Sequence, residues 1–223
     1  MIIERRYNGP PDSGNGGWTA GLVASLIDSP QGTVVTLRVP PPLGTPLSAR
    51  PLDGRVAVYT GDGILVAEGA ADPLDKTAVP AVPFEEALAL GSTYPGLVRH
   101  PFSTCFVCGP DRAPGDGLRL FPGRLADGRT ATAWVVPDRV SAPLVWAALD
   151  CPGGWSIDIQ TRPYVLGRLA VRVDALPTPG EHCVVMGQLV ERDGRKARVR
   201  STLYSSRRRV LAAGRATWLA IAT

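Results

Sequence analysis

Histidine is scarce in this chain of 223 residues, which contains only His100 and His182. A serine or cysteine nucleophile needs a neighbouring base, and histidine is the usual one. His182 precedes Cys183 in a predicted strand, where adjacent side chains point to opposite faces of the sheet, so these two residues cannot easily act as a pair. The scarcity of histidine therefore argues against an enzyme built on a nucleophile and a histidine base.

Long apolar runs are also missing. No stretch of about eighteen apolar residues is present to span a bilayer, and residues 1–6 lack the charged-then-apolar order of a secretory signal. We therefore expect a soluble protein of the cytoplasm that has no membrane partner. In that setting we expect the four cysteines to be thiols or metal ligands rather than structural disulfides. They are Cys105, Cys108, Cys151 and Cys183.

Lysine occurs only at positions 76 and 196, so almost all basic residues are arginines, and many lie between residues 192 and 209. A nucleic-acid surface would interleave aromatic residues with them, and only Tyr204 is available, so we expect no nucleic-acid partner. Arg198 and Arg200 alternate with Val199 and Ser201, which is typical of the solvated face of a sheet. A narrower interpretation is that one or two of these arginines meet the phosphates of an anionic cofactor.

The chain does contain short motifs that occur once in each half. Gly-Gly-Trp followed by a small hydroxylated residue occurs at residues 16–19 and again at residues 153–156, although the chain has only five tryptophans. Residues 58–69 are likewise similar to residues 203–214, and the two pairs of similar segments come in the same order along the chain. Together they indicate an internal duplication.

Apolar periodicity and turn signals predict a helix and several antiparallel strands in each half. In the first half, a helix that is apolar on nearly every face covers residues 15–27. Strands follow at residues 33–39, 55–60 and 64–70. In the second half we expect strands at residues 118–121 and 130–136 and a helix from residue 142 that ends or kinks near Pro152. Four more strands are predicted at residues 168–176, 182–191, 196–204 and 209–221.

A proline-rich segment at about residues 72–98, with one short helix at residues 84–90, is the predicted connection between the halves. We therefore place an N-terminal repeat at residues 1–98, including this connection, and a C-terminal repeat at residues 99–223. A helix with several long strands, occurring twice, describes a double hotdog. This is an α+β fold in which two antiparallel sheets each wrap around a buried central helix.

Three segments carry a resemblance that agrees with this architecture. They are residues 13–21, residues 100–109 together with residues 115–118, and residues 145–151. In these segments the chain resembles the hotdog thioesterase superfamily, especially the single-chain, two-repeat acyl-CoA thioesterase-like proteins of actinobacteria.

The resemblance implies hydrolysis of acyl-CoA or acyl-carrier thioesters. A carboxylate positions a water molecule, and backbone N–H groups at the start of a buried helix polarise the acyl carbonyl. Asp150 is the expected base, because burial in an apolar helix raises a carboxyl pKa. Asn15 is the second expected catalytic residue, although it also suits helix capping. The expected substrate-binding residues are Gly16, Gly17, Trp18, Trp146 and Thr161. No cofactor is expected apart from the coenzyme A of the substrate.

Relatives of this kind often carry a histidine before the paired glycines, where this chain has Asn15 and Pro152. That departure keeps a second hypothesis open, in which the protein binds an acyl-CoA or another hydrophobic ligand without hydrolysing it. Asp158 is a further available carboxylate. A homodimer is compatible with either hypothesis, as is a monomer, because a double hotdog already contains the pair of units that single-repeat relatives form by dimerising.

Cys105 and Cys108 have the spacing of metal ligands, His100 lies nearby, and Cys151 or Cys183 would complete a set of four. A structural zinc site needs four convergent ligands, and one Cys-x-x-Cys pair does not establish them. We therefore favour a reduced pair that packs the loop and expect no metal, with zinc as the alternative.

Overall fold

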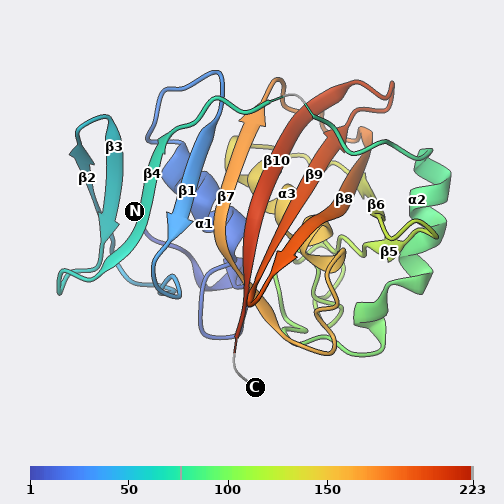
Figure 1. Cartoon of the computed structure of the whole chain (residues 1–223), viewed down its shortest axis with the longest axis horizontal. Helices are drawn as coiled ribbons and strands as arrows, with labels where there is room; N and C mark the ends of the chain where they lie inside the picture. The colour runs from blue at the N-terminus through green and yellow to red at the C-terminus, as the bar shows by residue number, and fades with distance from the viewer. Residues whose placement is uncertain (76, 222–223) are drawn as a thin grey trace.

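The computed structural model describes residues 1–75 and 77–221. Ten strands form one antiparallel sheet in the order β2-β3-β4-β1-β7-β10-β9-β8-β6-β5. Helices α1 and α3 lie behind the sheet in Figure 1, and α2 lies beside the edge formed by β5 and β6. The strands are β1 (Thr33–Leu37), β2 (Ser48–Leu52), β3 (Arg55–Tyr59), β4 (Leu65–Ala71), β5 (Gly123–Arg124), β6 (Thr130–Val135), β7 (Tyr164–Val173), β8 (His182–Asp193), β9 (Lys196–Tyr204) and β10 (Val210–Ala220). The helices are α1 (Gly16–Ala24), α2 (Phe84–Leu90) and α3 (Ala142–Trp155), with 3₁₀ turns η1 (Arg5–Tyr7), η2 (Gly91–Thr93) and η3 (Pro95–Leu97).

The sheet is continuous across both halves of the chain, which corrects the prediction of two separate sheets. Strands β1 and β7 pair antiparallel, with Thr33 opposite Val171 and Thr36 opposite Arg168. Each half would otherwise expose the N–H and C=O groups of an edge strand, and pairing the two edges satisfies both. Because this pairing joins strands far apart in sequence, no local pattern reports it.

Helix α3 continues past Pro152, where the sequence predicts an end or a kink. Proline lacks the N–H that would close a helical hydrogen bond. The surrounding sheet supports this turn instead, because the Pro152 carbonyl accepts a hydrogen bond from Thr130 Oγ1 at 2.6 Å. The glycines that follow let the sheet approach closely, since a Cβ at Gly154 would lie 2.5 Å from the Trp218 ring. Tertiary contacts thus override the local signal.

The strand predicted at residues 118–121 is irregular, and β5 begins only at Gly123. Arg119 has a φ of +50°, which interrupts an extended chain. The segment pairs instead with the loop that carries Cys105 and Cys108, because Leu118 N–H donates to the Phe106 carbonyl and Leu120 N–H to the Val107 carbonyl, both at 2.8 Å. Other differences from prediction include β2, which is an additional strand, and the boundaries of β7, which begins at Tyr164, and of α1, which ends at Ala24.

The segment that connects the halves packs on the strands of the C-terminal half. The Val79 N–H donates to Thr202 Oγ1 at 2.9 Å, and the Tyr204 hydroxyl donates to the Val79 carbonyl at 2.7 Å. Val82 and Ala87 are buried in the same apolar cluster, which includes Met186. The connection therefore covers part of the sheet on the side of β8 and β9, and α2 forms where the predicted short helix was placed.

Helices α1 and α3 cross in close contact, and two glycines of α1 allow it. A Cβ at Gly21 would lie 2.6 Å from Pro143 Cα, and a Cβ at Gly17 would lie 2.5 Å from Asp150 Cβ. These glycines are four residues apart and so share one face of the helix. Their absence of side chains sets the distance between the two helices.

We expect Gly21→Ala to lower the free energy of unfolding by about 1–3 kcal/mol, the usual cost of overpacking a core. In an exposed helix the same substitution would stabilise, because alanine has the higher helix propensity. Chemical denaturation of the variant measures the effect. Gly61→Ala is the matched control, since a Cβ there meets nothing within 4 Å. Equal stability of Gly21→Ala and the wild type would contradict the close helix crossing.

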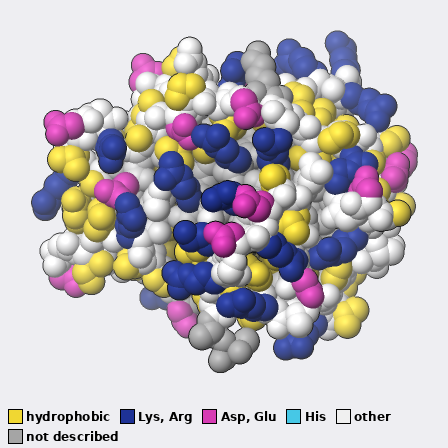
Figure 2. Space-filling model, viewed as in Figure 1, with side chains coloured by type: hydrophobic (Ala, Val, Ile, Leu, Met, Phe, Trp, Pro, Cys, Tyr) yellow, Lys and Arg dark blue, Asp and Glu magenta, His cyan; other side chains and the backbone are white. Residues whose placement is uncertain are grey.

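The face of the sheet turned away from α1 and α3 is charged. Figure 2 shows basic side chains spread over this face, with acidic ones among them. Arg198 and Arg215 are exposed on β9 and β10, and both are paired with acids: Arg198 with Glu191, and Arg215 with Asp72 at 2.8 Å. This is the solvated outer face that the alternation in β9 predicts.

Among the described residues, no helix is long and apolar enough to cross a membrane.

Candidate active site

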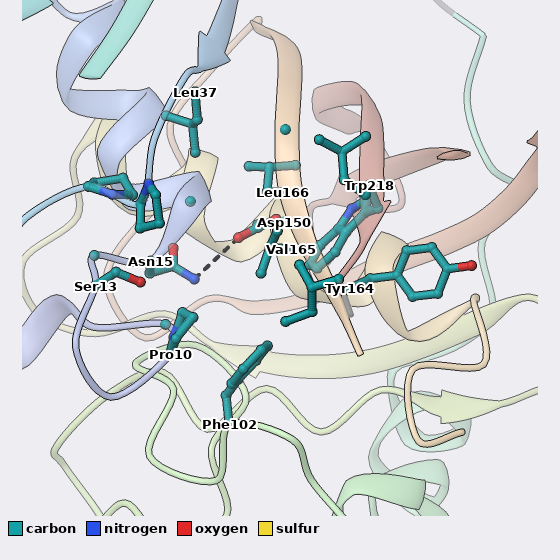
Figure 3. Close-up of a pocket in the computed structure, with 18 of the residues that line it drawn as sticks. Pro10, Ser13, Asn15, Leu37, Phe102, Asp150, Tyr164, Val165, Leu166 and Trp218 are labelled. Atoms are coloured by element: carbon teal, nitrogen blue, oxygen red, sulfur yellow. Dashed lines mark hydrogen bonds between the residues drawn. The ribbon is translucent and has the colours of Figure 1, made fainter. Parts of the chain in front are cut away.

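The start of α1 and the middle of α3 meet at a buried carboxylate. Asp150 lies on α3 and is only 2% exposed. Its Oδ2 accepts a hydrogen bond from the Gly17 N–H at 2.9 Å and another from Asn15 Nδ2 at 3.2 Å. Figure 3 shows the second of these bonds. One half of the chain therefore supplies the acid, and the other supplies two donors that fix its orientation.

Asn15 has two structural roles. Its Oδ1 accepts a hydrogen bond from the Trp18 N–H at 2.8 Å, so Asn15 is the N-cap of α1. Since the oxygen of the amide is committed to a backbone donor, its nitrogen must face the other way. Nδ2 contacts Asp150 Oδ2 there, and it lies 3.8 Å from Cys105 Sγ. The cap thus fixes the donor that holds the carboxylate.

The second carboxylate oxygen of Asp150 has a different environment. Oδ1 is buried, and among the described residues it has no hydrogen-bond partner. Burial raises the Asp150 pKa to about 7, against the opposing effect of the Gly17 N–H and the Asn15 amide. A buried polar atom without a protein partner calls for an explanation, and a bound water or ligand is the usual one. Oδ2 is therefore the anchored oxygen, whereas Oδ1 has no partner in the described part of the chain.

Asp150 lies at a cavity of about 490 Å³. Figure 3 shows Asp150 and Asn15 facing this space, with apolar side chains from several elements around it. The walls are mostly apolar, which is typical of a small-molecule site with a few placed polar groups. The lining residues include Pro10, Ser13, Asn15, Gly16, Leu37, Phe102, Cys105, Asp150, Cys151, Tyr164, Val165, Leu166 and Trp218.

Gly16 and Gly17 differ in what they offer the cavity. The sequence suggests that the Gly17 N–H contacts a substrate carbonyl. In the structure this N–H donates to Asp150 instead, so it is not available to a substrate. Gly16 lines the cavity, and its N–H has no hydrogen-bond partner in the part of the chain that the structure describes. A free N–H in the first turn of a helix is a donor in a region of positive potential. Of the two glycines, Gly16 is therefore the one with an unpaired N–H beside the cavity, as far as the described residues show.

Three other expected substrate-binding residues do not line the cavity. Trp18 stacks on Tyr7, with ring centroids 3.8 Å apart, and packs against Phe106. Trp146 is buried on α3 at the helix crossing, where it contacts Gly21. Thr161 is exposed beyond the end of α3 and bonds to Asp158, which is also exposed. None of these three residues therefore lies in the lining of the cavity.

Sequence reasoning missed most of the apolar wall. Leu37, Leu166 and Trp218 come from β1, β7 and β10, and Phe102 comes from the loop before Cys105. Alternation along the strands identifies which residues point inward. It does not identify which inward residues border a cavity, because that depends on strands contributed by both halves.

Three cysteine sulfurs lie beside the cavity. The Sγ atoms of Cys105, Cys108 and Cys151 all lie within 4.8 Å of one another, and all three residues are buried. The Cys105 and Cys151 sulfurs are 3.9 Å apart. Hydrogen bonds from neighbouring groups lower the pKa of the Cys105 thiol below its ordinary value. Cys183 is buried elsewhere, on β8, and does not belong to this cluster.

No protein-family model and no curated protein matches this sequence. Solved structures match it over almost its whole length. One is a protein of Novosphingobium aromaticivorans provisionally described as a thioesterase, with 16% identity and a TM-score of 0.64, covering 100% of this chain and 94% of that one.

Two further structures agree with it. A protein of unknown function with a hot dog fold from Alicyclobacillus acidocaldarius has 14% identity and a TM-score of 0.63, covering 99% of this chain and 92% of that one. The tesB protein of Mycobacterium avium subsp. paratuberculosis has 14% identity and a TM-score of 0.59, covering 96% and 90%. At these identities the likeness concerns the fold. The antiparallel sheet, the helices packed against it and these near full-length matches together identify the chain as an α+β protein of the hotdog fold.

Proposed function

We propose that this chain hydrolyses acyl thioesters, carried by coenzyme A or an acyl carrier, with Asp150 as the base. The observation that carries the proposal is the asymmetry of Asp150. Two donors hold Oδ2, whereas Oδ1 is buried without a partner among the described residues, and Asp150 lines an apolar cavity. Three of the structures with this fold are described as thioesterases or carry a thioesterase name, which supports the reaction class.

The chemistry follows from where the donors and the acceptor lie. A water molecule bound to Asp150 Oδ1 attacks the acyl carbonyl carbon, and its proton passes to the carboxylate. The carbonyl oxygen becomes an oxyanion, which the Gly16 N–H at the start of α1 stabilises. The carbon–sulfur bond then breaks, and the proton held by Asp150 passes to the leaving thiolate. The products are a carboxylic acid and a free thiol.

The anchoring of Oδ2 supports this assignment in two ways. It fixes the plane of the carboxyl group, so that the free oxygen keeps one direction. The raised pKa, about 7, suits a group that must accept a proton and then return it near neutral pH. An acid facing solvent would meet neither condition, as Asp158 illustrates, because it is exposed and bonded to Thr161.

The apolar wall is the proposed acyl site. A cavity of about 490 Å³ lies in the range usual for small-molecule sites. We expect Leu37→Trp, which fills part of this space from β1, to raise KM for long acyl chains more than for short ones. Steady-state kinetics over a series of acyl-CoA lengths measures the shift. Leu52→Trp is the control, because Leu52 is 51% exposed on β2. If Leu37→Trp leaves the preference for acyl-chain length unchanged, the cavity does not hold the acyl chain.

Activity itself is tested with purified protein and acyl-CoAs of short, long and aromatic type. Loss of the thioester's ultraviolet absorbance is the preferred signal, since the protein's own cysteines do not contribute to it. Turnover that depends on Asp150 supports the proposal.

Ligand binding without hydrolysis is the second candidate, because the structure shows no histidine among the residues lining the cavity. Thermal stabilisation by an acyl-CoA that remains intact over hours would favour it over hydrolysis.

A further inference from the structure

The cysteine cluster has the spacing that one metal ion requires. Zinc binds thiolates at about 2.3 Å, which places tetrahedral ligand sulfurs about 3.8 Å apart. The Cys105 and Cys151 sulfurs are 3.9 Å apart, and no pair in the cluster is separated by more than 4.8 Å. The widest pair would have to close by no more than about 1 Å. Three soft sulfur ligands favour zinc over the hard cations that oxygen ligands bind.

Two of the sulfurs belong to a tight turn built around the first of them. The Gly109 N–H donates to the Cys105 carbonyl at 2.9 Å, and a Cβ at Gly109 would lie 2.5 Å from Cys105 N. The turn is therefore organised before any ion binds.

The third sulfur comes from a rigid element. Cys151 lies in the middle of α3, directly after Asp150, and is buried. The turn is itself held in place by Leu118 and Leu120, which bond to the carbonyls of Phe106 and Val107. A loop and a helix, distant in sequence, thus present three sulfurs to one point.

His100 is placed as a donor to the cluster. Its Nδ1 accepts a hydrogen bond from the Phe102 N–H at 2.9 Å, so in the neutral ring the proton resides on Nε2. Nε2 lies 3.3 Å from the Cys108 sulfur and donates to it. The Asn15 amide nitrogen, 3.8 Å from the Cys105 sulfur, is a second donor. Such outer donors offset the negative charge of a thiolate-rich site.

We propose that Cys105, Cys108 and Cys151 bind one Zn²⁺ ion beside the cavity. The fourth position of the ion belongs to a water or ligand molecule, because the cluster contains three protein ligands among the described residues and two of them line the cavity. The ion links the loop that carries Phe102 to the helix that carries Asp150. This inference revises the expectation of a metal-free protein, because the sequence left open whether Cys151 or Cys183 converges on the Cys105 and Cys108 pair.

The metal content of untagged protein, purified under reducing conditions, tests the proposal. We expect one zinc per chain by mass spectrometry of the elements, retained on dialysis and released when a mercurial reagent titrates the thiols. Protein reconstituted with Co²⁺ should show intense visible bands of tetrahedral coordination and a thiolate-to-cobalt charge-transfer band. A chelator should lower Tm, and added zinc should restore it.

Cys151→Ser should lose the ion, whereas Cys183→Ser should retain it, because Cys183 is buried outside the cluster. If Cys151→Ser fails to fold, the cobalt spectrum of the wild type still tests whether the three sulfurs bind a metal ion. Substoichiometric zinc that dialysis removes, or a wild-type chain without cobalt bands, would overturn the proposal. So would a Cys105–Cys151 disulfide in protein isolated without reductant and without metal. None of these readouts depends on hydrolysis, so the zinc site and the proposed activity stand or fall separately.

Discussion

Replacing Asp150 by asparagine is expected to lower kcat/KM for thioester hydrolysis by about 10²–10⁴-fold, which is the usual contribution of a positioned general base. Asparagine has nearly the same shape, and its oxygen can still accept the Gly17 N–H. The variant removes the proton acceptor at Oδ1 while preserving most of the packing between α1 and α3. Steady-state kinetics gives the loss in rate, and thermal unfolding shows whether the fold is retained.

Asp158→Asn is the matched control for Asp150→Asn. Asp158 is the nearest alternative carboxylate in sequence, and the structure places it in an exposed turn outside the cavity lining. We expect its variant to keep the wild-type rate. If Asp150→Asn keeps that rate as well, Asp150 is not the base, and the binding hypothesis gains the advantage.

Replacing Asn15 by aspartate should reduce activity about a hundredfold or more at neutral pH, approaching the loss of the base itself. An aspartate still caps the helix, because its side chain accepts the Trp18 N–H as the asparagine does. As a carboxylate it offers no N–H to Asp150 Oδ2, and it places a second acid where a donor lay at 3.2 Å. Two carboxylates so close share one proton, and this proton competes with the one that Asp150 must accept from water. Rates measured for matched preparations of variant and wild type give the effect.

Asn15→Ser separates the helix-capping role of Asn15 from its hydrogen bond to Asp150. Serine is a good N-cap, but its side chain is too short to reach Asp150 while bonding to the Trp18 N–H. We expect nearly wild-type stability with an intermediate loss of kcat. Full activity in both Asn15 variants would mean that the residue is only a cap. A stability loss that accounts for the whole rate effect would lead to the same conclusion.

The sequence predicts the two central residues of the candidate site for sound physical reasons. Asp150 stands out because a carboxylate in an apolar helix is costly unless it is paired or used. Asn15 stands out because it precedes a glycine-rich apolar helix, where a cap is expected. The structure brings these two residues into contact at one cavity.

Of the remaining expected site residues, Gly16 lines the cavity, and the others lie outside its lining, namely Gly17, Trp18, Trp146 and Thr161. Thr161 is an expected substrate-binding residue, but α3 ends at Trp155, and Thr161 lies in an exposed turn beyond it. The Trp18 ring packs against Tyr7, which lies outside α1, and against Phe106, which is distant in sequence. Side-chain direction around an all-apolar helix cannot be derived from periodicity, because every face is apolar.

The sequence by itself determined the kinds of element, most of their positions along the chain, and the presence of one unusual acid. It could do so because periodicity, capping and turn chemistry are local properties of a chain. Only the tertiary structure decided that the strands form one sheet, that Gly17 rather than Gly16 holds Asp150, and that Cys151 joins Cys105 and Cys108. The first depends on the pairing of β1 with β7, and the other two depend on how closely α1, α3 and a distant loop approach one another. That distance is set by the packing of side chains far apart in sequence, above all at glycines where a Cβ would collide.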